Sequence, residues 1–583
     1  MKNKLTNNYL VFKSFKSYFL LSVMGVIAGT VGMFIDGIII GNFFGNDGLV
    51  SFGLASPIII VIIAFSTVFA NGGIVSASNY LGAEDNEKFN MNFTVTLLVS
   101  IGISLIIGLL SPFYSSYLAV LLGAKGSLIA STSDFIFGVL LGTIFLVLSQ
   151  VLLSYVRLDG SPSLGMISAV VATIANFIVA ILVVTVFDLG LFGIGIANSF
   201  SYGLATLVLC IHFLYKKNTL AFTKIKGGFK ELLKIIKLGL PTALNRLYVT
   251  FRTLITNYLA MWVGGAIVMG ALSIQTNIYQ IMISLSTGIA MTTLLLGGIF
   301  FGEEDRRSLI DLLNISLKVG VGIMVIVVAL VWIFAPNIVA IFGDNVEVRE
   351  TAIYSLRIFS LSLPFSLICG VLMNFYNSVN NLYMSNYLAI SHNLIFISMF
   401  ALILTPLIGQ NGIWLCFLLG ESVSLIGLFA LAKVKYNIVP KSISDFLFLD
   451  ESFDENIISS LEISLENNID EIIRLSNKVK SFGEKYPGND EKINELALCV
   501  EEMGGNIIKY GFEKSKLHYI DIRIILTKDN LIFRIRDDGK PFNPIKYADE
   551  NRESNTGILA IRKIAKTMDY RNTIGLNNLT ITL

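Results

Sequence analysis

The feature that most constrains this chain is a succession of apolar segments running from Tyr18 to about Leu431. A helix needs about 20 apolar residues to cross the hydrocarbon core of a bilayer, and roughly twelve segments here meet that length. The sequence therefore predicts an all-α polytopic membrane protein with 12 transmembrane helices. Their approximate centres are Ile27, Ile62, Ile103, Leu140, Ala172, Ala205, Ile255, Ser284, Val325, Leu363, Ile395 and Leu425.

The composition changes beyond Lys433, where acids and bases become frequent and stay so up to Leu583. Over the whole chain only 14% of residues are charged and 54% are hydrophobic. A soluble domain carries about 25% charged residues, so the deficit belongs to the apolar part. The chain is thus expected to consist of a membrane body followed by a soluble tail.

An internal repeat divides the membrane body into two halves. The stretch "LGAEDNEK" (residues 81–88) reappears as "FGEEDRRS" (residues 301–308), with Gly, Glu and Asp matching at a constant spacing of 220 residues. Two homologous halves are typical of secondary transporters. The longest charged break, residues 215–237, follows the sixth segment. We therefore expect two six-helix lobes, residues 1–230 and 231–437.

The basic residues predict the orientation in the membrane. They gather before residue 17, between 216 and 237, at Arg306–Arg307 and at Lys433 and Lys435. The intervening loops, residues 41–48 and 186–193, carry almost none. Because positively charged loops stay in the cytoplasm, the pattern predicts a protein of the plasma membrane with both termini cytoplasmic.

Three stretches resemble the multidrug and toxic compound extrusion (MATE) family of transporters: residues 36–57, 73–88 and 155–182. The last is the most specific, since Arg157, Gly160 and Pro162 match the turn before the family's fifth span, and Asn176 matches an Asn within it. The resemblance covers about residues 10–437. It implies an antiporter, coupled to Na⁺ or H⁺, that exports organic cations, drugs or metabolites. Its partners would be a small-molecule substrate and membrane lipid.

Ionisable residues inside the apolar segments need a reason, because a charge at the bilayer centre costs at least about 2.5–3.5 kcal/mol. The resemblance implies that Asp36, in the first span, is a Na⁺ or proton site; the alternative is an acid facing headgroups or water. Glu421, in the twelfth span, either coordinates a cation or pairs with Arg246 or Arg252. His392 is interpreted as a core histidine rather than a proton relay.

The sequence departs from the family where relatives carry acids. An acid four residues after the fifth-span Asn is replaced by Ala180, and the tenth-span region offers Asn374, Asn377 and Asn380. An asparagine oxygen can help to coordinate sodium, but it cannot carry a proton. The candidates for the transport cavity are Asn176, Asn374, Asn377 and Glu421.

The tail is expected to be a two-layer α/β sandwich over residues 465–583, joined to the body by a linker at 438–464. Apolar residues recur at helical spacing in two segments, followed by two alternating runs around Lys528–Asn530 that predict a strand pair. A further helix and a closing strand complete the expected order. The expected helices are 467–483, 491–511 and 557–568, and the expected strands are 519–526, 531–536 and 578–583.

Three motifs in the tail carry candidate chemistry. In "VEEMGGNIIKYGF" (residues 500–512), Glu502 and Asn506 lie one helical turn apart, so both side chains can meet one ligand. "RDDGKPF" (residues 536–542) follows an expected strand. In "NTGILAIR" (residues 555–562), Gly557 stands at the start of a helix, whose free N–H groups can receive phosphate.

Together these motifs resemble the histidine-kinase-type ATPase domain, the GHKL-type fold, in its anti-sigma-factor kinase branch. The resemblance implies that Asn506 holds Mg²⁺, that Glu502 acts as general base, and that Asp537 binds the adenine of ATP. Gly539 would let the backbone approach the base, and Gly557 would serve the phosphate lid. The lid, residues 544–557, has a single glycine where many relatives have two or three.

Two functional hypotheses remain open from the sequence. The first is an antiporter tuned by a cytosolic Mg-ATP-binding domain; the second is a membrane-tethered serine kinase or signalling protein whose transporter body is a sensor or anchor. Whether the tail is an enzyme stays open. A protein partner of the tail and a dimer through it are compatible with both, and nucleic acid is not an expected partner. No P-loop is present, so ATP-driven transport is not favoured.

Overall fold

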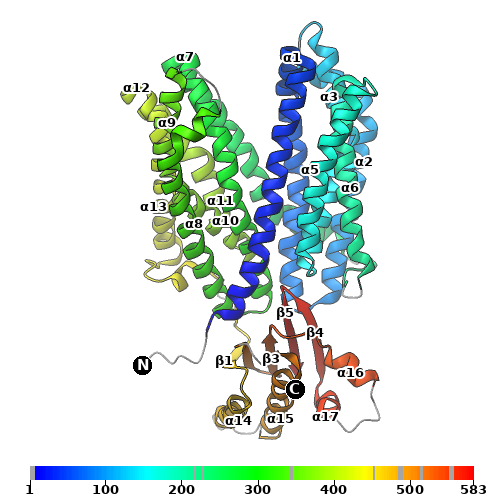
Figure 1. The fold of residues 1–583 in the computed structure, drawn as a ribbon. Helices are drawn as coiled ribbons and strands as arrows, with labels where there is room; N and C mark the ends of the chain where they lie inside the picture. The colour runs from blue at the N-terminus through cyan, green and yellow to red at the C-terminus, as the bar shows by residue number, and fades with distance from the viewer. Residues whose placement is uncertain are drawn as a thin grey trace. The chain divides into compact units, whose positions relative to one another are not determined.

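The computed structural model describes residues 7–215, 218–225, 227–341, 346–450, 453–483, 490–512, 517–550 and 557–583. The chain folds as two compact units. Tyr18–Phe448 form one, and the start of the chain up to Ser17 joins Leu449–Leu583 in the other. The first consists of helices, and the second contains a β-sheet (Figure 1).

The larger unit is helical throughout. Its first half contains α1 (Tyr9–Gly82), α2 (Asn86–Leu121), α3 (Leu128–Leu141), α4 (Thr143–Leu158), α5 (Pro162–Thr185) and α6 (Gly190–Cys210). Its second half contains α7 (Gly228–Gly302), α8 (Arg306–Ala340), α9 (Val346–Ser360), α10 (Leu363–Ser378), α11 (Leu382–Ile390), α12 (Phe396–Ile408) and α13 (Gln410–Tyr436). A π-helical turn, Ser391–Ile395, joins α11 to α12.

Many of these helices are long and apolar enough to cross a membrane. Within the described ranges nine pass that test, and eleven do if the bent pairs α3–α4 and α9–α10 each make one span. The backbone of α7 leaves helical geometry at Gly264 and Gly265, so α7 is two helices joined at a kink. The part before the kink carries Arg246 and Arg252 and corresponds to the seventh of the twelve expected spans. The fold is that of a multi-pass membrane protein.

The repeat seen in the sequence is a repeat in the structure. Glu84 and Glu304 both have a positive φ, 61° and 53°, in the turns after α1 and α7. The next residue caps the following helix in each case: Asp85 accepts from the N–H of Lys88 at 3.0 Å, and Asp305 accepts from that of Ser308 at 2.9 Å. The two halves therefore begin their second long helix in the same way.

Close backbone contacts between α1 and α7 join the two lobes near these turns. A Cβ on Gly82 would stand 2.0 Å from the carbonyl oxygen of Ile299, and one on Gly302 would stand 2.1 Å from that of Asn79. Only glycine permits such an approach. In Figure 1 the helices of the two lobes diverge from this end toward the opposite one.

The smaller unit contains a five-stranded sheet with strand order β1-β2-β3-β5-β4, in which all neighbours are antiparallel. Its apolar face is covered by helices, and the buried core includes Val479, Val500, Phe533 and Ile561. This is the expected two-layer α/β sandwich. The elements are β1 (Ile457–Glu466), α14 (Ile469–Gly483), α15 (Asp490–Asn506), a π-helical turn (Ile507–Gly511), β2 (Tyr519–Thr527), β3 (Leu531–Asp537), α16 (Pro544–Glu550), α17 (Gly557–Ile564), β4 (Thr567–Thr573) and β5 (Leu576–Thr582).

The strand pair expected around Lys528–Asn530 is confirmed, since β2 and β3 pair antiparallel on either side of that turn. The helix expected over residues 557–568 ends earlier, at Ile564, because Met568 pairs with Ile581 in the sheet as part of β4. The first strand, β1, begins at Ile457, within the segment 438–464 suggested as a linker. The sheet therefore takes in the end of that segment.

Candidate functional site

Helix α15 presents Glu502 and Asn506 away from its core face. Val500 is fully buried, and a Cβ on the buried Gly504 would stand 2.5 Å from Ile472 of α14. Glu502 and Asn506 are half-buried on a different side of the helix. The core face thus fixes the rotation of α15, as the sequence predicts.

Glu502 lies against Gly557, the first residue of α17. A Cβ on Gly557 would stand 2.0 Å from Glu502 Oε2, so a larger residue here would require the Glu502 side chain to move. The free N–H groups at a helix N-terminus favour negative charge in such a position. Two of the three motifs therefore meet, although they are far apart in the sequence.

The Asp537 carboxylate ends β3 and is only 3% exposed. The N–H of Gly539 donates to Oδ1 at 2.7 Å, and Asn577 Nδ2 donates to the same oxygen at 2.8 Å. Among the described residues Oδ2 has no hydrogen-bond partner, so it can accept one from a ligand. Burial raises the pKa of Asp537 to about 6, and the hydrogen bonds from Asn577 and Gly539 oppose that rise.

The loop after Asp537 contacts the end of the π-helical turn that follows Asn506. The N–H of Lys540 donates to the carbonyl oxygen of Gly511 at 2.9 Å, and a Cβ on Gly539 would stand 2.8 Å from that oxygen. Glu502 also contacts Gly557. These two contacts bring together the elements that carry the predicted site residues, which are Glu502, Asn506, Asp537, Gly539 and Gly557. Of the predicted lid, residues 551–556, including Asn555, lie outside the described residues.

Asn577 is a site residue that the sequence motifs do not reveal. It lies directly opposite Asp537 in the pairing of β3 with β5, and it is 6% exposed. Its position depends on the register of two strands, which no local motif encodes. The available signal is the polar pair Asn577–Asn578, which interrupts the alternation of apolar and polar residues in this strand.

Asp538, next to Asp537, binds the start of the chain. Its Oδ2 accepts from Lys13 Nζ at 2.5 Å and from the Tyr9 hydroxyl at 3.2 Å, while His518 Nδ1 lies 2.9 Å from its Oδ1. The rings of Tyr9 and Tyr519 are 5.2 Å apart. These contacts place the beginning of α1 on the tail unit, which the sequence does not predict.

In the membrane unit, Asp36 is buried among three helices. It is 6% exposed; Asn176 of α5 donates to its Oδ1 at 2.6 Å, and Asn198 of α6 donates to its Oδ2 at 2.8 Å. The buried Oδ1 of Asn176 has no partner in the part of the chain that the structure describes. The structure thus brings the predicted Asp36 and Asn176 together and adds Asn198. Ala180, one turn after Asn176, is fully buried.

The asparagines predicted on the tenth span lie on α10. Asn374 donates to the carbonyl oxygen of Gly370 in its own helix at 2.9 Å. Asn377 is fully buried, and neither of its amide atoms has a partner within the described ranges. Asn380 lies in the turn after α10, where its side-chain amide is 3.1 Å from that of Asn79.

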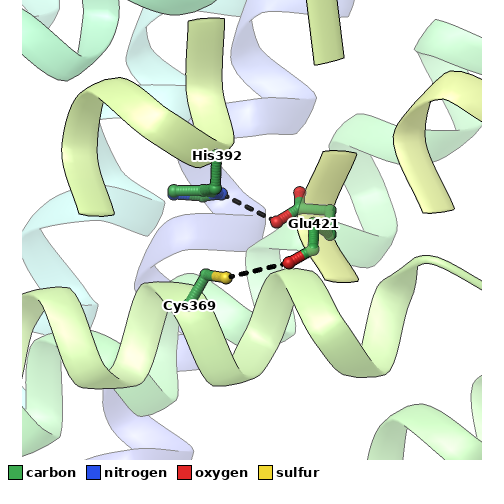
Figure 2. A group of neighbouring side chains, drawn as sticks. All are labelled: Cys369, His392 and Glu421. Atoms are coloured by element: carbon green, nitrogen blue, oxygen red, sulfur yellow. Dashed lines mark hydrogen bonds and ion pairs between the residues drawn. The ribbon is translucent and has the colours of Figure 1, made fainter. Parts of the chain in front are cut away.

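Glu421, on α13, is paired with a histidine. Its Oε2 lies 3.0 Å from His392 Nδ1, and both side chains are buried (Figure 2). Neither Arg246 nor Arg252, the expected bases, is an ion-pair partner of Glu421 among the described residues. Arg252 instead lies 5.4 Å from the ring centroid of Phe417. Both ring nitrogens of His392 have neighbours, as expected of a core histidine.

Comparison with protein families identifies both parts of the chain. The MatE profile matches residues 22–182 and 241–402, which is more than half of the chain. The profile described as "Histidine kinase-like ATPase domain" matches residues 465–583. The two matches to the first profile fall one in each half of the membrane unit.

Curated relatives match the membrane part. The chain is 24% identical over 348 residues to "Multidrug export protein MepA" of Staphylococcus saprophyticus, covering 59% of this chain and 75% of that protein. It is 23% identical over 356 residues to the protein of the same name from Staphylococcus aureus strain MSSA476, covering 60% and 78%.

Solved structures share the fold of the membrane unit. One is titled an outward-facing conformation of a multidrug resistance MATE family transporter of the MOP superfamily; it has a TM-score of 0.69, 20% identity, and covers 75% of this chain and 99% of that chain. Another is a MOP superfamily transporter from Pyrococcus furiosus, with a TM-score of 0.68, 20% identity, and coverage of 76% and 100%.

Asp537 makes the stability of the tail depend on pH. Because its pKa is raised to about 6 in the folded state, the folded tail holds a proton that the unfolded chain releases near pH 4. The free energy of unfolding of the tail should therefore fall by about 2 kcal/mol as the pH rises from 4 to 6, because the folded state must give up a proton that it holds more tightly than the unfolded chain does. Pulse proteolysis of the full-length protein in urea measures this change, and Asp537→Asn should remove it. An equal pH dependence in Asp537→Asn would contradict the assignment.

Proposed function

The chain belongs to the MatE family, and from this premise we propose that it is an antiporter that exports organic cations, drugs or metabolites in exchange for Na⁺ or H⁺. We further propose that its histidine kinase-like ATPase domain binds Mg-ATP and regulates that exchange. The names of the relatives, multidrug export proteins, support the class of substrate. The observation that carries the proposal is the buried Asp36 with its two asparagines.

The surroundings of Asp36 fit a coupling ion. Two amide N–H groups donate to its carboxylate, which stabilises the charged form inside an apolar body. The unpartnered Oδ1 of Asn176 is on the same amide that contacts Asp36, so it adds a second oxygen for a cation. Oxygen ligands of this kind suit a hard cation such as Na⁺, and the carboxylate can also carry a proton.

Buried polar groups in the C-terminal lobe support a polar pathway for the substrate or the coupling ion to which both lobes contribute. Asn377 is buried with an amide that binds nothing among the described residues, which costs free energy unless a ligand or water satisfies it. We assign Asn176, Asn374, Asn377 and Glu421 to the route of the substrate or of the coupling ion. None of the three asparagines can change its protonation state, so they would bind without titrating.

The residues of the tail fit Mg-ATP. Asp537 offers the free Oδ2 to the adenine amino group, and the glycines at 511 and 539 leave no Cβ between the backbone and a bound base. Asn506 would hold Mg²⁺, and the start of α17 at Gly557 would receive phosphate. With Mg-ATP bound, the negative charge beside the start of α17 would come from the phosphates. In this structure the carboxylate of Glu502 lies in that position.

The contact of Asp538 with Lys13 and Tyr9 supports regulation by the tail. Asp538 is adjacent to the proposed adenine-binding Asp537, so a ligand that moves this loop changes what holds the first residues of α1. The same helix continues to Asp36. Nucleotide binding is thereby linked to the helix that carries the proposed coupling site.

The same contact supports the orientation. Residues at the start of the chain belong to the tail unit, which supports our proposal that both termini lie on one side of the membrane and that the number of spans is even. The positively charged loops place that side in the cytoplasm, where ATP is available.

Asp36→Asn should abolish ion-coupled export, because the amide keeps the shape of the site but carries neither a proton nor a negative charge for Na⁺. The measurement is export of a fluorescent organic cation from proteoliposomes, with Na⁺ and pH gradients imposed separately. Asp188→Asn, which changes an exposed acid in the turn after α5, is the matched control and should export normally. Coupled export by Asp36→Asn at the wild-type rate would reject this site.

Asn506→Ala should weaken Mg-ATP binding to the full-length protein by about 10–100-fold, since it removes the proposed Mg²⁺ ligand. Isothermal titration in detergent measures the affinity. Asn477→Ala, an exposed asparagine on α14, should bind like the wild type. Wild-type protein that takes up no Mg-ATP would exclude the nucleotide role.

A further inference from the structure

Three donor side chains of different chemistry meet inside the C-terminal lobe. Cys369 comes from α10, His392 from the π-helical turn and Glu421 from α13. One donor atom of each lies within 4.8 Å of the other two, and Figure 2 shows the side chains converging. We propose that these residues form a binding site for a divalent transition-metal ion of the Zn²⁺ class. Such a site goes beyond the proposed exchange of organic cations for Na⁺ or H⁺, which does not require a transition metal.

The donor set selects the class of ion. Hard ions such as Na⁺ and Mg²⁺ prefer oxygen, and here only Glu421 supplies a side-chain oxygen. Zn²⁺ and similar ions accept thiolate, imidazole and carboxylate together. A sulfur and a nitrogen beside one carboxylate therefore favour a borderline transition metal over an alkali or alkaline-earth ion.

The geometry needs little adjustment to close around an ion. In a tetrahedral zinc site, bonds of about 2.0–2.3 Å place the ligand atoms about 3.3–3.8 Å apart. His392 Nδ1 and Glu421 Oε2 are already 3.0 Å apart. The Cys369 thiol points at α13, where its Sγ lies 3.9 Å from the carbonyl oxygen of Glu421.

A divalent cation would balance the charge of the group when all three residues bind it. Cys369 is fully buried, and His392 and Glu421 are 6% and 3% exposed. A thiolate and a carboxylate together carry two negative charges, so a divalent ion makes the site neutral. Neutrality removes the cost of isolated charge in the apolar body.

A neighbouring amide fixes the orientation of the His392 ring. Asn393 Nδ2 donates to the carbonyl oxygen of Ala389 at 3.0 Å and lies 2.6 Å from His392 Nε2, so it holds the ring with Nδ1 toward Glu421. In metal sites, hydrogen-bonding partners of the second ring nitrogen orient the histidine ligand. Both residues are on the π-helical turn, a feature often found at functional sites.

Three protein ligands leave a fourth tetrahedral position open. Structural zinc sites use four protein ligands, whereas sites with three keep a position for water or another ligand. The site would therefore bind an ion that exchanges with solvent rather than one locked into the fold.

Titration of the purified full-length protein with Co²⁺ tests the proposal, because a thiolate bound to Co²⁺ gives a charge-transfer absorption in the near ultraviolet. The wild type should gain this band, saturate at one equivalent and lose it to added Zn²⁺. Cys369→Ser should show no band. Cys416→Ser is the matched control: Cys416 is also buried, lies on α13 and donates only to the carbonyl oxygen of Ile413 in its own helix, so the band should remain.

Absence of the band in the wild type, or its persistence in Cys369→Ser, would overturn the proposal. Asn393→Ala should keep the band but weaken Co²⁺ affinity by about 10–100-fold, an effect that a purely structural asparagine would not produce. If Cys369→Ser does not elute as a folded protein, His392→Gln gives the same comparison. That variant keeps the thiol, and unchanged Co²⁺ affinity in it would equally reject the site.

Discussion

The cost of placing charge in an apolar interior determines where the polar residues of the membrane unit lie. Asp36 has an amide donor on each carboxylate oxygen, and these donors come from two other helices. Glu421 has His392 on a neighbouring element. Asp36 thus joins three helices of the N-terminal lobe, and Glu421 joins two elements of the C-terminal lobe, so the groups proposed for ion binding also hold each lobe together internally.

The tail follows a different constraint, because its sheet leaves an edge and a face that must be covered. Helices cover the apolar face, and the start of the chain contacts Asp538, Tyr519 and Ser464 of the same unit. This arrangement joins the two ends of the sequence in one folded unit. The helix that begins there also carries Asp36, and its first residues contact Asp538, the neighbour of the proposed adenine-binding Asp537.

Much of this could be predicted from the sequence. The apolar segments, the repeat at 220 residues and the three tail motifs have local signals, and the fold and both families agree with them. Contacts set by strand register or helix packing had no such signal: Asn577 opposite Asp537, Asn198 beside Asp36, and Lys13 on Asp538. The sequence predicts that α17 ends later than it does, because Met568 fits both the apolar face of a helix and a strand. The pairing of Met568 with Ile581 of β5 decides for the strand.

We propose that nucleotide binding in the tail acts on transport through the first residues of α1. Export driven by an imposed Na⁺ or pH gradient tests this in proteoliposomes with and without Mg-ATP on the tail side, for the wild type, Lys13→Ala and Lys16→Ala. Lys16 is an exposed lysine of the same helix that has no ion pair in the described part of the chain. We expect Mg-ATP to change the export rate by about fivefold or more in the wild type and Lys16→Ala, and not in Lys13→Ala. A wild-type rate that ignores Mg-ATP, or an undiminished response in Lys13→Ala, would contradict it.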